Sequence, residues 1–217
     1  LGFYRFCMNR PGIAHKRLYA YYDGNQPLVY STQRLREVFG QTLNAHFAQN
    51  WCAVVIDSVL ERLNLSQFSI PTNTQAEKQL NQLWTASEMQ VDSDDAHLAS
   101  LVTGEGYVIV WREAEGPVEA YYNDPRLCHI VYDSENPRLK RLAAKWWVDD
   151  EEKRRLTLYY PDRLEYYATS KKAETVSSAK DFQPTEVPSA VNPYQTIPVF
   201  HLQRERRIVK GELANVI

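Results

Sequence analysis

The spacing of apolar residues changes once along this chain, close to Gly104. Upstream, apolar residues recur every three or four positions, as in NWCAVVIDSVLERL at 50–63. Downstream, they tend to alternate with polar residues, as in RRLTLYY at 154–160. The first spacing is typical of helices with one buried side, and the second of strands with one buried face. The sequence therefore predicts an α+β fold, with N-terminal helices packed on an antiparallel, meander-rich β-sheet region.

Start and stop residues divide the helical part into separate elements. The expected helices cover 12–22, 32–39, 50–63, 74–88 and a last span from 92–95 to Gly104. Asn9 and Pro11 suit the start of the first helix, and Gly24 suits its end. Thr74 and Glu77 form a capping box for the fourth helix.

Apolar spacing also predicts which sides of these helices are buried. The wide apolar side of the third helix is expected to pack into a core through Trp51, Cys52, Val55, Ile56, Val59, Leu60 and Leu63. The fourth helix is expected to be buried through Leu80, Leu83 and Trp84. The last helix is expected to turn Leu98, Leu101 and Val102 inward.

The second half of the chain is expected to form an antiparallel meander. Its strands are predicted at 107–111, 118–122, 127–132, 139–148, 154–160, 163–168 and 197–202. Residues 169–196 are rich in Lys, Ser, Thr, Ala and Pro, which predicts a long flexible surface excursion. The expected parts are a mainly helical part at 1–104, a β part at 105–202 and a short connection at 203–217.

Composition limits the environment of the protein. The longest apolar run, at 51–60, is interrupted by Asp57 and is much shorter than the roughly 20 residues that cross a bilayer. We therefore expect no membrane partner. The cysteines at 7, 52 and 128 form no CxxC pair, which favours reduced thiols.

Several patterns that often carry chemistry are incomplete here. The pair Gly104 and Gly106 lacks the third glycine of a nucleotide-binding loop. Cys128 and His129 are adjacent in a predicted strand, so they point to opposite faces and do not share a metal. We expect no catalytic residue, no cofactor and no metal.

Two alternatives from other functional classes stay open. The first is an aromatic-rich binding module, since the chain has five Trp and fourteen Tyr residues that can stack on a ligand. The second is a hydrolase that uses two carboxylates from Glu105, Glu113, Glu119 and Asp124.

Charge is distributed unevenly along the chain. Residues 77–119 hold nine acidic and two basic side chains, a net charge of −7, whereas 201–210 carries +3. Opposite patches of this kind suit head-to-tail packing of identical subunits. We expect subunit contacts between the acids Asp92, Asp94 and Asp95 and the bases Arg204, Arg206 and Arg207.

The order of several segments resembles the tailed-bacteriophage portal protein family, the head-to-tail connectors. These segments are YYDGNQPL at 21–28, the helix at 50–63, HLASLVTGEGYVIVW at 97–111, DPRLCHIVYD at 124–133 and IPVFHL at 197–202. The resemblance implies a fragment of the outer wing of a portal subunit. The stem, clip and crown are then expected outside this sequence. Another phage connector is the alternative within this class.

The resemblance also implies a function. Portal subunits form a ring, usually of twelve copies, at one vertex of the capsid. The ring conducts double-stranded DNA during packaging and ejection without tight specific binding. It docks the terminase large subunit, the capsid and scaffold, and the head-completion proteins. The protein is then expected in the virion, after synthesis in the bacterial host cytoplasm, and is not an enzyme.

Individual positions match the family motifs, and their implied role is structural. They are Tyr22, Asp23, Gly24, Asn50, Val55, Asp57, Arg62, Leu63, Gly104, Gly106, Asp124, Pro125, Tyr132 and Asp133. The extended segment after Gly24 is expected to be an arm that packs on a neighbouring subunit through Leu28 and Val29.

Overall fold

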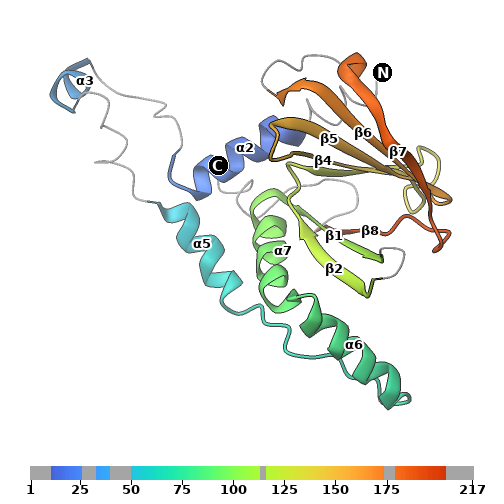
Figure 1. Cartoon of the computed structure of the whole chain (residues 1–217). Coiled ribbons are helices and arrows are strands. Elements are labelled where there is room, and N and C mark those ends of the chain that lie inside the picture. The colour runs from blue at the N-terminus through green and yellow to red at the C-terminus, as the bar shows by residue number, and fades with distance from the viewer. Residues whose placement is uncertain (1–10, 26–32, 40–49, 113–115, 174–178, 204–217) are drawn as a thin grey trace.

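The computed structural model describes residues 11–25, 33–39, 50–112, 116–173 and 179–203. Helices dominate the part before Gly104, and two antiparallel sheets make up the part after it (Figure 1). The predicted α+β fold class is therefore confirmed.

The helices follow the apolar spacing of the sequence. They are α2 (Pro11–Tyr22), α3 (Gln33–Phe39), α5 (Trp51–Leu60), α6 (Thr74–Ala86) and α7 (Met89–Thr103). Gly24 and Gly104 follow α2 and α7 with φ angles of 73° and 87°. These are left-handed conformations that glycine adopts without a Cβ penalty, so both predicted helix stops are confirmed.

The strands form two sheets. They are β1 (Glu105–Arg112), β2 (Val118–Asn123), β3 (Cys128–Tyr132), β4 (Lys140–Val148), β5 (Lys153–Tyr159), β6 (Arg163–Lys172), β7 (Phe182–Val191) and β8 (Val199–Gln203). The smaller sheet has the order β2-β1-β8, and the larger sheet the order β3-β4-β5-β6-β7. A short 3-10 helix, η3 (Ala179–Asp181), precedes β7.

The main core lies between the two sheets. Tyr107 and Ile109 of β1 and Val199 of β8 are fully buried there. They pack against Cys128, Ile130, Ala143, Tyr159 and Leu164 of the larger sheet. Alternate residues of β1 therefore face the larger sheet, as the period of two requires.

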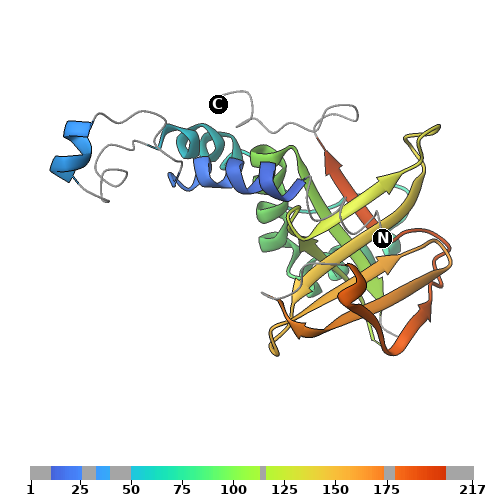
Figure 2. The ribbon, with the colours of Figure 1, turned by 90° about the horizontal axis from the view of Figure 1, so that it is seen from above.

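The helices form a separate layer beside the smaller sheet (Figure 2). A second core joins α2, α5 and α7, where Ile56 and Val102 are fully buried. Gly106 of β1 lies against α7, and a Cβ added to it would stand 2.9 Å from the carbonyl oxygen of Ala96. Glycine at this position therefore permits the close approach of helix and sheet.

Helix α6 begins at Thr74 as predicted, but its predicted cap is wrong, and so is the predicted start of α7. Asn73, rather than Thr74, caps α6, because its Oδ1 accepts a hydrogen bond of 3.0 Å from the Ala76 amide. Glu77 accepts instead from the amide of Ile70, at 2.8 Å. Helix α7 begins at Met89, ahead of the predicted 92–95, so Asp92 lies inside its first turn.

The expected burial of two helices is also only partly correct. Helix α6 has no fully buried residue, and Leu80, Leu83 and Trp84 are only half-buried. The reason is that α6 extends away from the two sheets (Figure 1). In α5, Ile56 is buried but Trp51 is 66% exposed. The apolar residues of α5 thus lie on two sides of the helix, and only one side is covered.

The predicted excursion at 169–196 is wrong for most of its length. Strand β6 continues to Lys172, and β7 pairs with it in antiparallel register. Proline usually indicates that a segment is not a strand, and Pro184 and Pro188 lie in β7. The larger sheet ends at β7, and an edge strand accommodates proline because one row of its amides has no ladder partner.

Candidate functional site

Motif positions from two separate segments meet at a junction between α2 and α5. The Tyr22 hydroxyl donates a hydrogen bond of 2.8 Å to Oδ1 of Asp57. The Asn50 side-chain amide donates to the carbonyl oxygen of Tyr22. Oδ1 of Asn50 also accepts from the amide of Ala53 at 3.1 Å, which caps the start of α5.

Gly24 lies at the same junction. A Cβ added to it would stand 3.4 Å from Nδ2 of Asn50, in addition to the cost of a positive φ for other residues. The other motif residues of this region are exposed: Asp23, Val55, Arg62 and Leu63. The junction therefore rests on Tyr22, Gly24, Asn50 and Asp57.

We predict that Asn50→Ala lowers the free energy of unfolding by about 1–2 kcal/mol, because the substitution removes the cap of α5 and the bond to Tyr22. Chemical denaturation followed by circular dichroism measures the change. Asn25→Ala is the matched control, since Asn25 is exposed just after α2. Equal losses in both variants would contradict a specific role for Asn50.

A second group of motif residues shapes the chain between β2 and β4. Oδ1 of Asp124 accepts from the Arg126 amide at 2.7 Å, while the Arg126 guanidinium pairs with the same carboxylate and stacks 4.3 Å from the ring centroid of Tyr19. Pro125 is fully buried. Asp133 accepts from the amides of Asn136 and Glu135, and these bonds lower the pKa of its carboxyl. Both aspartates thus stabilise turns.

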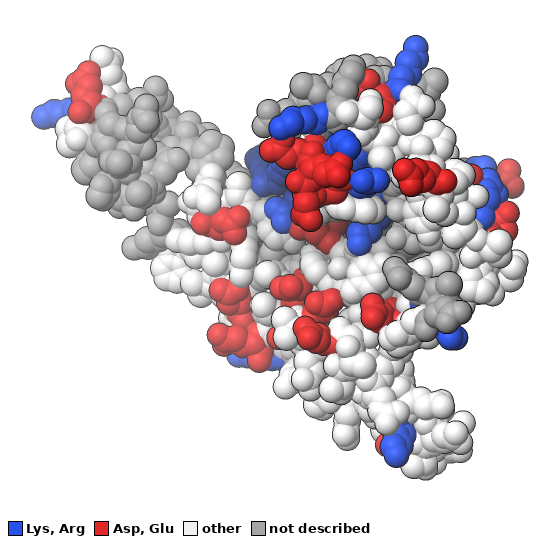
Figure 3. Space-filling model, in the orientation of Figure 1, with Lys and Arg blue, Asp and Glu red and all other residues white. Residues whose placement is uncertain are grey.

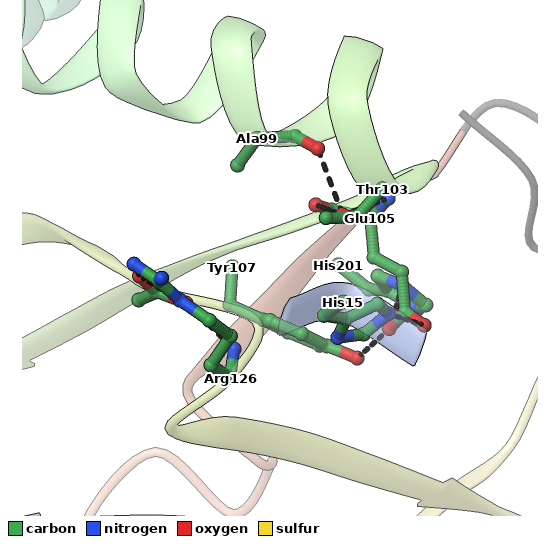
Figure 4. Close-up of polar contacts among 8 residues, drawn as sticks. His15, Ala99, Thr103, Glu105, Tyr107, Arg126 and His201 are labelled. Atoms are coloured by element: carbon green, nitrogen blue, oxygen red, sulfur yellow. Dashed lines mark hydrogen bonds and ion pairs between the residues drawn. The ribbon is translucent and has the colours of Figure 1, made fainter. Parts of the chain in front are cut away.

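A carboxylate is buried where helices and sheets meet (Figure 4). The Tyr107 hydroxyl donates a hydrogen bond to Oε2 of Glu105. Nε2 of His15, on α2, lies 3.4 Å from Oε1, and Nε2 of His201, on β8, lies 3.5 Å from Oε2. The Glu105 side chain is 8% exposed. We call Glu105, Tyr107, His15 and His201 the buried carboxylate cluster.

Further contacts hold this cluster in place. The His201 ring stacks on Tyr107 with centroids 4.7 Å apart, and its Nδ1 lies 3.0 Å from the hydroxyl of Tyr132. Tyr132, a motif residue on β3, thereby links the cluster to the larger sheet. The cluster connects α2, strands β1 and β8 of the smaller sheet, and β3 of the larger sheet.

The electrostatics of the cluster favour an ionised carboxylate. Burial alone would raise the pKa of Glu105, but the close His15 and His201 rings and the hydrogen bond from Tyr107 outweigh it and hold this pKa well below its usual value. Burial, together with the Glu105 charge, raises the pKa of Tyr107 well above its usual value. Burial also lowers the pKa of nearby His129.

This chemistry fits a structural contact better than a hydrolytic site. A general acid usually needs a raised pKa and access to substrate, and Glu105 has a lowered pKa and is almost fully buried. Asp124 is paired with Arg126, and Glu119 is exposed. Glu113 lies outside the described residues. Within the described ranges, no three His, Cys, Asp or Glu side chains form a group that could hold a metal ion.

The chain can be compared with known protein families. A family model described as phage portal protein, SPP1 Gp6-like, matches residues 13–217. The chain belongs to this portal protein family. The resemblance predicted from the ordered motifs is therefore confirmed. A search of curated proteins finds no significant match.

Membership in the portal family has direct consequences for the protein. The family has a structural rather than an enzymatic role, as part of the phage head-to-tail connector. It implies an oligomeric ring and a place at the capsid vertex of the virion. In the part of the portal chain that the structure describes, no helix has the length and hydropathy to span a membrane.

The residues expected at subunit contacts have different positions in this portal chain. Asp94 and Asp95 are exposed on α7, whereas Asp92 is half-buried and accepts from the amide of Tyr122 at 2.6 Å. The Asp92 carboxylate thus holds β2 against α7. Leu28, Val29, Arg204, Arg206 and Arg207 lie outside the described residues.

Sequence reasoning missed the buried carboxylate cluster in this portal protein. Its members come from positions 15, 105, 107 and 201, so no local spacing links them. One signal was present: Glu105 and Tyr107 alternate on a strand and thus share its buried face. An acid on a buried strand face requires partners, and histidines elsewhere were candidates.

Proposed function

We propose that this chain is the outer wing of a portal subunit. The subunits form a ring that conducts the phage genome during packaging and ejection, and this ring docks the terminase large subunit, the capsid and scaffold, and the head-completion proteins. The family match over 13–217 is the observation that carries the proposal. We further propose that 1–104 is the helical part of the wing and 105–202 its β part.

The contacts among the motif residues are consistent with a rigid structural element. The helix junction joins α2 to α5, and the buried carboxylate cluster joins α2 to both sheets. Both sets hold elements that are distant in sequence in fixed positions. A subunit that transmits load around a ring needs such fixed positions more than it needs a mobile active site.

Electron-microscope imaging of the purified full gene product tests this proposal. We expect closed rings of about twelve subunits around a central channel, with the symmetry counted from class averages. Monomers or dimers under assembly conditions would contradict the proposal. They would favour the aromatic-rich binding module instead.

Duplex DNA is expected to bind this protein only weakly. A channel that bound the phosphates of DNA tightly would slow the passage of the DNA. The surface around α5 and α7 is also rich in Asp and Glu side chains, which repel phosphates (Figure 3). We predict a Kd for duplex DNA of about 10⁻⁴ to 10⁻⁶ M at physiological salt, as for non-specific binding. Fluorescence anisotropy with two unrelated duplexes measures it. A sequence preference of about a hundredfold would contradict the prediction.

A further inference from the structure

The larger sheet carries a cavity of about 740 Å³ along strands β4 to β7. The strand registers place its main lining residues on one face of this sheet. Trp147 pairs with Arg155, which pairs in turn with Ala168. Thr157 pairs with Tyr166, and both lie two positions from a member of the first row, so their side chains share the same face. The volume lies in the range of roughly 300–1,000 Å³ that is usual for ligand sites.

A bulge in β7 forms one wall of the cavity. Residues 185–188 of β7 stand opposite the single residue Tyr166 of β6. The Thr185 hydroxyl donates a hydrogen bond of 2.7 Å to the carbonyl oxygen of Val187, which holds the bulge in shape. Bulges are frequent next to functional sites because they change the direction of a side chain. This bulge brings Glu186 to the wall of the cavity.

A buried hydroxyl lines the cavity without a protein partner. Thr157 is only 4% exposed, and no group among the described residues forms a hydrogen bond with its side chain. The hydroxyl of Thr103, which is equally buried, donates to the carbonyl oxygen of Ala99 at 2.8 Å. Because buried hydroxyls are normally hydrogen-bonded, the Thr157 hydroxyl indicates a polar ligand in the cavity.

The charged groups around the cavity are balanced. Nε of Arg155 donates to Oδ2 of Asp149 at 2.6 Å, and the two terminal nitrogens of Arg155 make no hydrogen bond within the described ranges. Glu186 is exposed and pairs with no described base. Nζ of Lys145 lies 5.6 Å from the ring centroid of Trp147. Two bases thus stand against two acids, so the site offers donors and an acceptor without requiring a charged ligand.

Aromatic rings supply the apolar part of the cavity. Trp147 is 37% exposed and Tyr166 is half-buried, and both line the cavity. Ala168 contributes only a methyl group, so it leaves space above the sheet. An accessible indole binds the flat apolar side of a ligand. The cavity therefore suits a ligand that has an apolar face and a polar rim.

We propose that this cavity binds a neutral saccharide. A pyranose ring has an apolar face of C–H groups that packs on an indole, and each of its hydroxyls both donates and accepts. These hydroxyls match the donors of Arg155, the acceptor of Glu186 and the hydroxyl of Thr157. A wholly apolar ligand would leave these groups unpaired when it covered them. The site goes beyond the proposed function and does not depend on ring assembly.

Titration of the full gene product with maltose, lactose, mannobiose and chitobiose tests the proposal. Saturation-transfer NMR detects the bound sugar, and calorimetry measures its affinity. At least one of the four is expected to bind saturably, and Trp147→Ala is expected to weaken that binding by about tenfold or more. Trp51→Ala is the matched control, because Trp51 is an exposed tryptophan that does not line the cavity. It is expected to bind as the wild type does.

Thr157→Val separates a role in binding from a role in folding. It is expected to weaken sugar binding by about fivefold or more, and to leave the melting temperature unchanged or raised, because it removes a hydroxyl that has no protein partner. Thr103→Val is the matched control. It removes a hydroxyl that is bonded within the fold, so it is expected to lower the melting temperature and leave sugar binding unchanged.

Several outcomes would overturn the inference. One is that none of the four disaccharides binds saturably. Another is that Trp147→Ala and Trp51→Ala lose affinity equally, or that Thr157→Val binds as tightly as the wild type. Saturable binding of glucuronate or of phenylalanine, with no binding of the neutral sugars, would assign the cavity to a charged ligand instead. Circular dichroism of each variant confirms that the protein is folded.

Discussion

Replacing Glu105 with alanine is expected to lower the free energy of unfolding by about 3–5 kcal/mol. The substitution leaves the Tyr107 hydroxyl and the His15 and His201 rings buried without the carboxylate that they all contact. It also opens a space where the carboxylate was. Urea denaturation followed by tryptophan fluorescence measures the loss.

Glu119→Ala is the control for this prediction. Glu119 is an exposed acid on β2, and its substitution is expected to change stability by no more than about 0.5 kcal/mol. A loss below about 1 kcal/mol for Glu105→Ala would show that the cluster contributes little to folding.

The lowered pKa of Glu105 also predicts how stability depends on pH. A carboxyl with a folded-state pKa below its usual value of 4.5 contributes stability above about pH 4.5, and this contribution is lost as the pH falls toward the folded-state pKa. The wild type is therefore expected to lose stability below about pH 4.5. Glu105→Gln keeps the shape without the charge, so its stability is expected to approach that of the wild type as the pH falls. A constant difference between the two down to pH 2.5 would contradict this assignment.

The second large effect is expected at Gly106. A side chain there meets the backbone of Ala96 at 2.9 Å, and a backbone carbonyl cannot rotate away as a side chain can. Gly106→Ala is expected to cost about 1–3 kcal/mol, and Gly106→Val more, because α7 must move away from β1. Thermal melts show whether Gly106→Val unfolds at a lower temperature than Gly106→Ala.

Arg112→Val is the control, because it introduces the same side chain at an exposed position of the same strand. It is expected to stay within about 0.5 kcal/mol of the wild type. If Gly106→Val matched this control, α7 would be shown to tolerate a shift from the sheet.

Local signals predicted most of the fold. Gly24 and Gly104 were correctly predicted to end helices, because a left-handed backbone conformation strongly favours glycine. The change of period near Gly104 separated helices from strands because each period follows from backbone geometry. The elements that rest on such local rules lie within a few residues of their expected positions.

Features that depend on tertiary context were not predicted. The apolar residues of α5 indicated burial, but sequence alone did not show that α2 and α7 cover only one side of it. Strand β7 was missed because an edge position, which tolerates Pro184 and Pro188, is known only from the sheet order. The buried carboxylate cluster depends on contacts of Glu105 with His15, 90 positions earlier in the chain, and with His201, 96 positions later.

The prolines of β7 have a further consequence for a protein that works in many copies. An open sheet edge offers a row of amides to any other exposed strand, and crowded identical subunits raise the chance of such pairing. Pro184 and Pro188 have no amide hydrogen to give, and Pro184 lies opposite Tyr167 in the last ladder of the sheet. Prolines on this edge strand therefore disfavour edge-to-edge pairing of subunits, because each one removes a possible amide donor.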